Sequence, residues 1–290
     1  MLLPISDSNP RQYIPFQYVT VGIIVACALV FLWQVTLPPR MAQEAVFALG
    51  AIPAVVFGER QLPPELSWVP AQVTLVTSMF MHGGWMHLLG NMLYLWILGD
   101  NVEDCMGHLR FLTFYLLCGL AAVLVHMSLD TSSTTPLIGA SGAISGVMGA
   151  YLLLHPKANI NVLIWILIFV RVVPVPAWIA LAFWIGLQFV NAAADPGTGG
   201  GVAWWAHIGG AAAGMMLVPF FKRRDVPLLA GVGGRPDHPH GVRRANLPEM
   251  GPWGRHREAD QDGDQGSPQG TDRDPGAGGV APLNLPILGA

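Results

Sequence analysis

The chain has 290 residues, of which 11% are charged and 52% are hydrophobic, whereas about a quarter of the residues in a soluble domain are charged. Residues 222–290 hold nine of the fifteen Lys and Arg and nine of the eighteen Asp and Glu, so the net charge of −3 says little about partners. The charge balance supports no nucleic-acid partner, and the composition predicts a membrane protein.

A helix needs roughly 20 apolar residues to cross about 30 Å of hydrocarbon, and six stretches free of charged residues meet this need. They lie near residues 18–37, 79–98, 111–129, 139–155, 173–193 and 203–221. The apolar run 158–170 is too short, and Arg171, Pro174 and Pro176 interrupt its continuation, so we expect an interfacial or partly buried connection there. The predicted fold class is an all-α membrane protein with a six-transmembrane-helix bundle.

An even number of spans places both termini on the same side of the membrane. Seven Lys and Arg beside the spans then fall on the side of the termini, and only Arg40 and Arg60 fall on the other. Because cytoplasmic loops carry the excess of positive charge, we expect a multi-pass protein of the plasma (inner) membrane with both termini cytoplasmic. The first apolar run lacks a small-x-small cleavage site, so we expect a retained helix rather than a signal peptide.

Three regions follow from these spans: a cytoplasmic N-terminal segment at 1–17, the six-helix core at 18–221 and a cytoplasmic tail at 222–290. The tail is rich in Pro, Gly, Asp and Arg and cannot bury enough apolar surface to fold, so we expect it to be disordered. In the loop between the first two spans, apolar positions lie beside Arg40 and Glu44. This pattern predicts an amphipathic helix in the outer interface, with an ordinary extracellular loop as the alternative.

A serine and a histidine stand out in the apolar part of the chain. Ser141, in Gly139-Ala140-Ser141-Gly142, begins the fourth predicted span, and His207 lies in the sixth. Polar groups inside a membrane are costly unless they are used, so the pair suggests a serine nucleophile with a histidine base. The first turn of a helix also offers unpaired N–H groups for the oxyanion of acyl transfer. Gly139 and Gly142 allow the tight backbone that an exposed nucleophile requires.

Small residues give these two spans a way to pack closely. They recur on the fourth span at Gly142, Gly146 and Gly149, and on the sixth span at Ala206, Gly210 and Gly214. Such stripes let helix backbones approach each other, with or without catalysis. Because one stripe bears Ser141 and the other bears His207, the two together predict a contact between these side chains.

Around the start of the second span, His87 and Asn91 are four residues apart and therefore share a helix face. Both side chains can donate a hydrogen bond to a developing negative oxygen. We assign them to the oxyanion site, with His82 as structural support beside it. The alternative is a buried polar network that ties helices together.

Three motifs together resemble the bacterial rhomboid intramembrane serine proteases over roughly residues 72–221: His82-x4-His87-x3-Asn91, Gly139-Ala140-Ser141-Gly142 and Ala206-His207-Ile208-Gly209-Gly210. The resemblance implies a six-helix core, a Ser–His dyad without a third acid, and cleavage of transmembrane segments of other membrane proteins near the outer face. It implies that Ser141 is the nucleophile and that His207 is the general base and then the general acid. It further implies oxyanion donors at His87, Asn91 and the Ser141 N–H, the lipid bilayer as surroundings, and no metal or organic cofactor.

Two features of the chain leave alternatives open. Ser145 stands where some members of that family carry Tyr, so the sequence does not say what packs against the His207 ring. Ser145 is itself a rival nucleophile, but it lies a turn deeper than Ser141, and we expect it to pack. The aromatic side chains of the fifth span either gate lateral substrate entry or form a lipid-facing stripe; they are Phe183, Trp184 and Phe189.

Other classes of function fit the sequence less well. A non-catalytic rhomboid-like factor that binds or delivers membrane clients is the alternative, but such relatives usually lack the Ser or the His. A transporter is not supported because the chain has no internal repeat. The sequence has no His-Glu-x-x-His zinc motif, and we expect its three cysteines to pack rather than to bind metal. Glu103, beyond the second span, is predicted to organise a loop.

Overall fold

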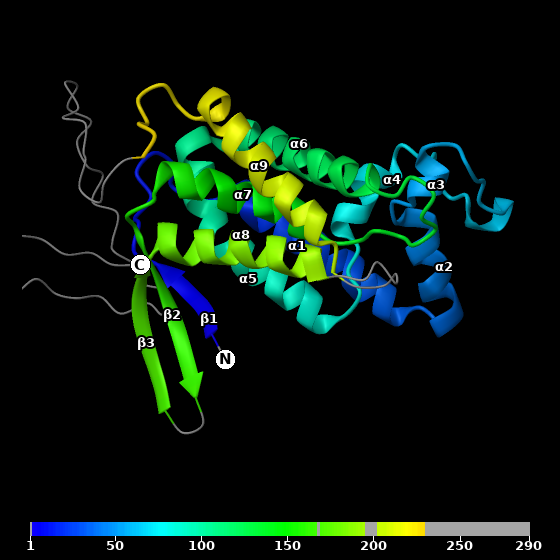
Figure 1. Cartoon of the computed structure of the whole chain (residues 1–290), viewed down its shortest axis with the longest axis horizontal. Helices are drawn as coiled ribbons and strands as arrows, with labels where there is room; N and C mark the ends of the chain where they lie inside the picture. The colour runs from blue at the N-terminus through cyan, green and yellow to red at the C-terminus, as the bar shows by residue number, and fades with distance from the viewer. Residues whose placement is uncertain (1, 167–168, 195–201, 230–290) are drawn as a thin grey trace, which may run out of the picture. The chain divides into compact units, whose positions relative to one another are not determined.

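The computed structural model describes residues 2–166, 169–194 and 202–229, and these are predominantly helical (Figure 1). The longer helices are α1 (Tyr18–Thr36), α5 (Trp85–Met106), α6 (His108–Met127), α7 (Ser141–Leu154), α8 (Ala177–Ala194) and α9 (Trp204–Phe221). Shorter helices between α1 and α5 are α2 (Pro39–Leu49), α3 (Pro53–Val56), α4 (Thr74–Thr77) and the 3-10 turns Pro64–Leu66 and Ser78–Phe80. The tail expected to be disordered begins at residue 222, but residues 222–229 pack against the helices: the Arg223 N–H donates to the Cys105 backbone oxygen at 2.8 Å, and Val226 is buried. The rest of the tail, from 230 onward, lies outside the described residues.

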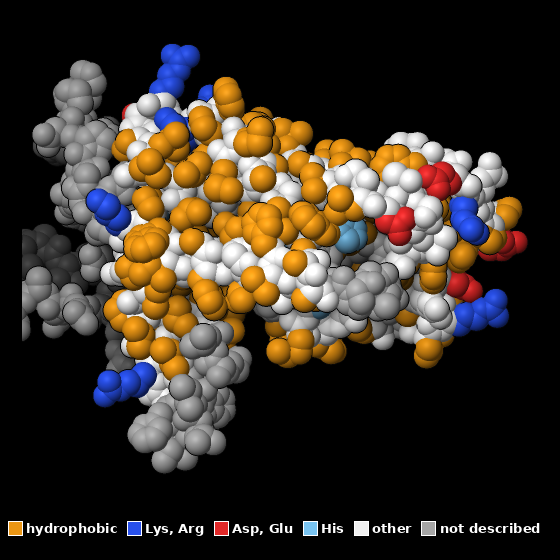
Figure 2. Space-filling view, viewed as in Figure 1, with side chains coloured by type: hydrophobic (Ala, Val, Ile, Leu, Met, Phe, Trp, Pro, Cys, Tyr) orange, Lys and Arg blue, Asp and Glu red, His pale blue; other side chains and the backbone are white. Residues whose placement is uncertain are grey.

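The surface of the helices is that of a multi-pass membrane protein. Among the described residues, α1, α6 and α8 are long and apolar enough to cross a membrane, and α7 is apolar but has only 14 residues. Large hydrophobic side chains are exposed along these helices, such as Leu29, Leu124 and Phe183. Figure 2 shows hydrophobic side chains spread over the middle of one face of the molecule, while Lys and Arg lie toward its ends. So much exposed apolar surface marks a region that faces lipid.

Three strands correct the prediction of an all-α fold. β1 (Leu2–Asp7), β2 (Asn159–Ile166) and β3 (Phe169–Pro176) form an antiparallel sheet in the order β1-β2-β3. The run expected to be an interfacial connection is therefore mainly β2, and the fifth predicted span begins at Ala177 rather than at 173. The reason is composition, because β-branched residues make up half of β2 and half of β3, and the prolines of β3 would interrupt a helix.

α5 also differs from the predicted span 79–98, since it begins at Trp85 and ends at Met106. Gly83 and Gly84 delay its start, and its last two turns carry acidic side chains whose partners include the N-terminal segment and the first turn of α1. Asp104 accepts hydrogen bonds of 2.7 Å from the backbone N–H groups of residues 12–14. Cys105, beyond the end of the predicted span, consequently lies within this helix and is buried.

Glu103, predicted to organise a loop, accepts hydrogen bonds from the first turn of a helix. Its carboxylate accepts hydrogen bonds from the Val19 N–H at 3.0 Å and from the Thr20 N–H at 2.8 Å, and these groups belong to the first turn of α1. It also accepts one from the Thr20 hydroxyl at 2.7 Å and lies 2.6 Å from His108 Nδ1. Glu103 therefore caps α1, whose first N–H groups have no partner within their own helix.

The predicted amphipathic helix of the outer loop corresponds to α2. Its Arg40 and Glu44 side chains form an exposed ion pair of 2.9 Å, while Ala45 and Ala48 are buried. The position of α2 in the membrane interface stays a prediction.

Candidate active site

Ser141 is the first residue of α7, and its side chain is half-buried. The preceding Gly139 has a φ of +128°, a conformation that side-chain-bearing residues rarely adopt. A Cβ at Gly139 would also lie 2.8 Å from the Nε2 atom of the His87 ring, so no other residue fits here without displacing that ring. Glycine at 139 thus lets the chain turn into α7 with the Ser141 hydroxyl beside the His87 side chain.

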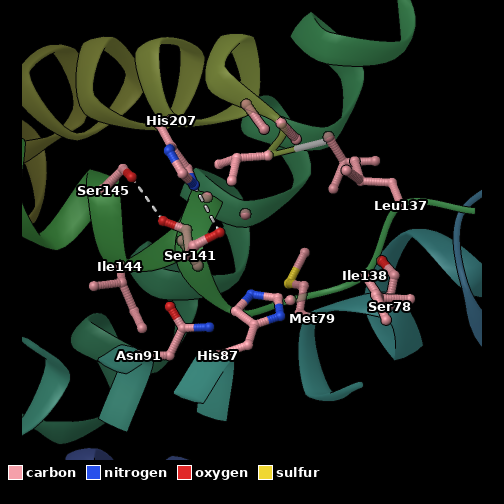
Figure 3. A pocket seen from close by; sticks show the side chains of 18 of the residues that line it. Ser78, Met79, His87, Asn91, Leu137, Ile138, Ser141, Ile144, Ser145 and His207 are labelled. Atoms are coloured by element: carbon pink, nitrogen blue, oxygen red, sulfur yellow. Dashed lines mark hydrogen bonds between the residues drawn. The ribbon is translucent and has the colours of Figure 1, made fainter. Parts of the chain in front are cut away.

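The structure brings Ser141 and His207 into contact. His207 lies in the first turn of α9, is 7% exposed, and has its Nε2 atom 2.9 Å from Ser141 Oγ (Figure 3). The small-residue stripes make this approach possible, because a Cβ at Gly210 would overlap the backbone oxygen of Gly142. A Cβ at Gly142 would in turn lie 2.6 Å from the Ala122 Cβ of α6.

On its other side, the His207 ring contacts residues of α8. Its Nδ1 atom lies 2.8 Å from Gln188 Oε1. The Trp184 ring lies 5.6 Å from the imidazole between centroids, and the Trp204 ring meets it edge-on at 6.2 Å. Aromatic rings from α8 and α9 therefore pack against the histidine in this chain, in which residue 145 is serine.

Gln188 was not singled out in the sequence. The signal that could have found it is an amide inside the apolar segment 177–194, placed four residues after Trp184. Of the three aromatic residues considered for a gate, Trp184 lines the cavity described below. Phe183 and Phe189 are more than half exposed and are not among its lining residues.

His87 and Asn91 lie in the first two turns of α5, across Ser141 from His207 (Figure 3). The Gly83 N–H donates to His87 Nδ1 at 3.3 Å, so in the neutral ring the proton is on Nε2, which is on the side of the ring that faces Gly139. Asn91 is 8% exposed, and its Nδ2 atom has no hydrogen-bond partner within the part of the chain that the structure describes. Both side chains can therefore donate into the space beside Ser141.

His82 does not line the cavity, but its ring packs against that of His87, which does. Its ring is 5.1 Å from that of His87 between centroids, and its Nδ1 atom lies 3.3 Å from the Phe80 backbone oxygen. The backbone of His82 exchanges two hydrogen bonds of 3.2 Å with the Gln34 side chain of α1. These bonds hold the segment that leads into α5.

The rival serine is engaged elsewhere. Ser145 is fully buried, and its hydroxyl donates to the Ser141 backbone oxygen at 2.6 Å (Figure 3). Its only hydrogen bond among the described contacts is to the backbone of its own helix, whereas the Ser141 hydroxyl contacts an imidazole. Ser145 therefore packs within α7, as expected.

A cavity of about 750 Å³ joins these side chains; the site residues among its lining are His87, Asn91, Gly139, Ser141, Gly142 and His207. A hydroxyl next to an imidazole can be deprotonated and attack a carbonyl carbon, and nearby N–H groups can stabilise the resulting oxyanion. Within the described residues no three His, Cys, Asp or Glu side chains are grouped to hold a metal ion. The fold and the site together define a multi-pass membrane protein with a serine–histidine pair beside a cavity.

The Rhomboid domain family model matches residues 70–224, which is more than half of the chain. The chain therefore belongs to the rhomboid family, whose members are generally intramembrane serine proteases, although some are inactive.

Several relatives share parts of this region. The chain is 31% identical over 189 residues to Rhomboid protein 1, mitochondrial, of Saccharomyces cerevisiae, which covers 60% of this chain and 52% of that protein. It is 30% identical over 155 residues to RHOMBOID-like protein 12, mitochondrial, of Arabidopsis thaliana, with coverage of 48% and 43%. It is 41% identical over 78 residues to Rhomboid protease GluP of Bacillus subtilis, with coverage of 27% and 15%. The matches span about half or less of each relative.

Proposed function

We propose that this protein is an intramembrane serine endopeptidase that cleaves transmembrane segments of other membrane proteins near the outer face of the membrane. The observation that carries the proposal is the 2.9 Å contact between His207 Nε2 and Ser141 Oγ at the wall of the cavity. Serine is a weak nucleophile by itself and becomes reactive when a base lies within hydrogen-bond reach.

In the proposed mechanism, His207 takes the proton of Ser141 as Oγ attacks the carbonyl carbon of the scissile peptide bond. The oxyanion of the tetrahedral intermediate accepts hydrogen bonds from Asn91 Nδ2, from the His87 ring and from the Ser141 N–H. His207 then donates its proton to the leaving amine, which frees the first product and leaves an acyl-enzyme. A water molecule deprotonated by His207 hydrolyses the ester and regenerates Ser141.

The length of α7 supports cleavage inside the membrane. Its 14 residues span about 21 Å at about 1.5 Å per residue, which is shorter than a hydrocarbon core of about 30 Å. Ser141, at the start of this helix, would then lie below one membrane surface, within reach of a substrate helix. The six longer helices, α1 and α5 to α9, form the proposed six-span core.

The orientation is also a proposal. Arg40 and Arg60 lie in the loop that joins α1 to α5, and the larger group of Lys and Arg flanks the spans on the other side. The positive-inside rule then places both termini in the cytoplasm of a plasma (inner) membrane protein and Ser141 toward the outer face. Fusing a reporter enzyme to either terminus measures this orientation directly.

The function is tested in liposomes with a single-span model substrate. Ser141→Ala and His207→Ala should each lower cleavage by at least about 10³-fold, because members of a catalytic pair act as a unit. Ser145→Ala is the matched control, and it should retain most of the activity. A serine-directed phosphonate should label Ser141 in the wild-type protein.

Cleavage that persists in Ser141→Ala, or labelling at Ser145 alone, would overturn the assignment of the nucleophile. A wild-type protein that binds the substrate helix without cleaving it would instead be a client-binding factor, the alternative considered from the sequence.

A further inference from the structure

Gln188 is an amide buried on an apolar helix, and both of its polar atoms are engaged. The side chain is 4% exposed on α8. Its Oε1 atom lies 2.8 Å from His207 Nδ1, and its Nε2 atom donates to the Trp184 backbone oxygen at 2.9 Å. The amide thus links the backbone of α8 to the imidazole that contacts Ser141.

The Trp184 carbonyl determines which way the amide points. A carbonyl oxygen accepts hydrogen bonds and cannot donate them, so it must face the NH₂ group of Gln188. The opposite orientation would set two oxygens against each other and would leave the buried NH₂ group against the imidazole. Oε1, an acceptor, is therefore directed at His207 Nδ1.

This orientation in turn selects the tautomer of His207. Because Oε1 can only accept, the neutral ring carries its proton on Nδ1 and has its lone pair on Nε2. Nε2 is the atom that lies 2.9 Å from Ser141 Oγ, so the lone pair is directed at the hydroxyl proton. The other tautomer would place an N–H against that hydroxyl and could not act as a base.

We propose that Gln188 is a positioning residue that holds His207 in its base-competent tautomer, as the third member of a Ser141–His207–Gln188 chain. The proposal rests on the proposed function of Ser141 and His207. Gln188 fills the place that a carboxylate takes in serine proteases with a catalytic triad, where loss of the tautomer-fixing group costs about 10⁴-fold. An amide gives the same orientation without placing a charge inside an apolar helix, which is costly.

A merely structural role makes a different prediction. Gln188 also ties α8 to α9, and interhelical hydrogen bonds stabilise membrane proteins. If that were its only role, replacement would lower stability without changing the turnover of the folded protein, and glutamate would rescue no better than methionine.

The test compares Gln188→Met with Gln188→Glu in the full chain, with Gln17→Met as the matched control. Methionine keeps the length of the side chain and removes the acceptor, whereas a glutamate oxygen accepts from Nδ1 whether the carboxyl group is charged or protonated. Gln17 is also a buried glutamine, but its side chain contacts Arg11 before α1.

For Gln188→Met we expect kcat to fall by about 10- to 100-fold while KM stays within about twofold, because the base is disordered but the cavity is kept. Gln188→Glu should restore kcat to within about threefold of wild type, and Gln17→Met should change neither constant. An unchanged kcat in Gln188→Met, or an equal loss in the methionine and glutamate variants, would overturn the proposal.

A second readout does not depend on turnover. In nitrogen-15 NMR of histidine-labelled protein, the His207 signals, identified by their loss in His207→Ala, should show a protonated Nδ1 in the wild type and a shift toward protonated Nε2 in Gln188→Met. Identical His207 signals in the two proteins would refute the tautomer role, even if wild-type turnover is absent and the proposed function itself fails.

Discussion

The two ends of α5 carry buried polar side chains that are used in opposite ways. At its C-terminal end, Glu103 and Asp104 accept backbone N–H groups of residues 12–14, 19 and 20 at 2.7–3.0 Å. At its N-terminal end, Asn91 has an Nδ2 atom with no partner among the described side chains and backbone, and this residue lines the cavity. A polar group that is satisfied on burial stabilises the fold, whereas one left unpaired beside a cavity is available to a ligand.

The largest effect on stability is expected from removing a hydrogen-bond acceptor at the C-terminal end of α5. Glu103→Ala leaves the N–H groups of Val19 and Thr20 without their acceptor, at about 1–3 kcal/mol each, and should lower the free energy of unfolding by about 2–6 kcal/mol. Phosphonate labelling per folded molecule should be unchanged. Unfolding in a denaturing detergent measures the first quantity.

The control is Glu44→Ala, which removes an exposed glutamate paired with Arg40 and should cost no more than about 0.5 kcal/mol. Equal losses in the two variants would mean that Glu103 does not cap α1.

Near the N-terminal end of α5, Asn91→Ala should lower the rate of cleavage without lowering the free energy of unfolding. Loss of this proposed oxyanion donor should lower kcat by about 10²- to 10³-fold, or about 3–4 kcal/mol in the activation free energy. The free energy of unfolding should not fall, because no described hydrogen bond of Nδ2 is lost. Asn161→Ala, on β2 and bonded to Ser6 at 3.0 Å, is the control and should leave kcat unchanged. A stability loss without a kcat effect in Asn91→Ala contradicts this comparison.

The smallest effect concerns Asp7 of β1, which accepts hydrogen bonds from Tyr151 Oη at 2.6 Å and Asn101 Nδ2 at 2.7 Å. Burial raises the pKa of Asp7 to about 6, above the value of about 3.9 in an unfolded chain. Between these two pH values the folded protein holds a proton that the unfolded chain has lost, so this residue makes stability fall as pH rises.

Asp7→Asn removes the titration. The variant should gain stability relative to wild type by about 1–3 kcal/mol between pH 4 and pH 6, with no further change above pH 6. Unfolding measured across this range checks the sign, and a difference that is constant with pH would contradict the raised pKa.

Much of the candidate site could be predicted from the sequence because its residues lie in short motifs with fixed helical spacing. His87 and Asn91 share a face through the geometry of one helix. The Gly139 turn precedes Ser141 directly, and the small-residue stripes predicted the contact with His207 across two helices. Gln188 was missed because a single glutamine has no spacing signal, and its partner is 19 residues away on another helix.

The sheet was missed for a different reason. Residues 158–170 read as an apolar run, and periodicity alone does not separate a short buried helix from a strand. Their pairing partners include residues 2–7, far away in the sequence, so the strand conformation depends on a long-range contact. The extension of α5 to Met106 also depends on long-range contacts, because Asp104 accepts hydrogen bonds from the N-terminal segment and Glu103 accepts them from the first turn of α1.

The sequence by itself determined the membrane class, most helix positions and the identity of the polar residues in the cavity. These depend on local physics: apolar length, helical period and the backbone freedom of glycine. The tertiary structure decided which polar groups are paired and which are not, and which tautomer His207 adopts. Those properties depend on the direction and distance of groups that lie far apart in the sequence. The contact of α5 with residues 12–20 sets the pairing of Glu103 and Asp104, and the packing of α7, α8 and α9 sets the His207 tautomer.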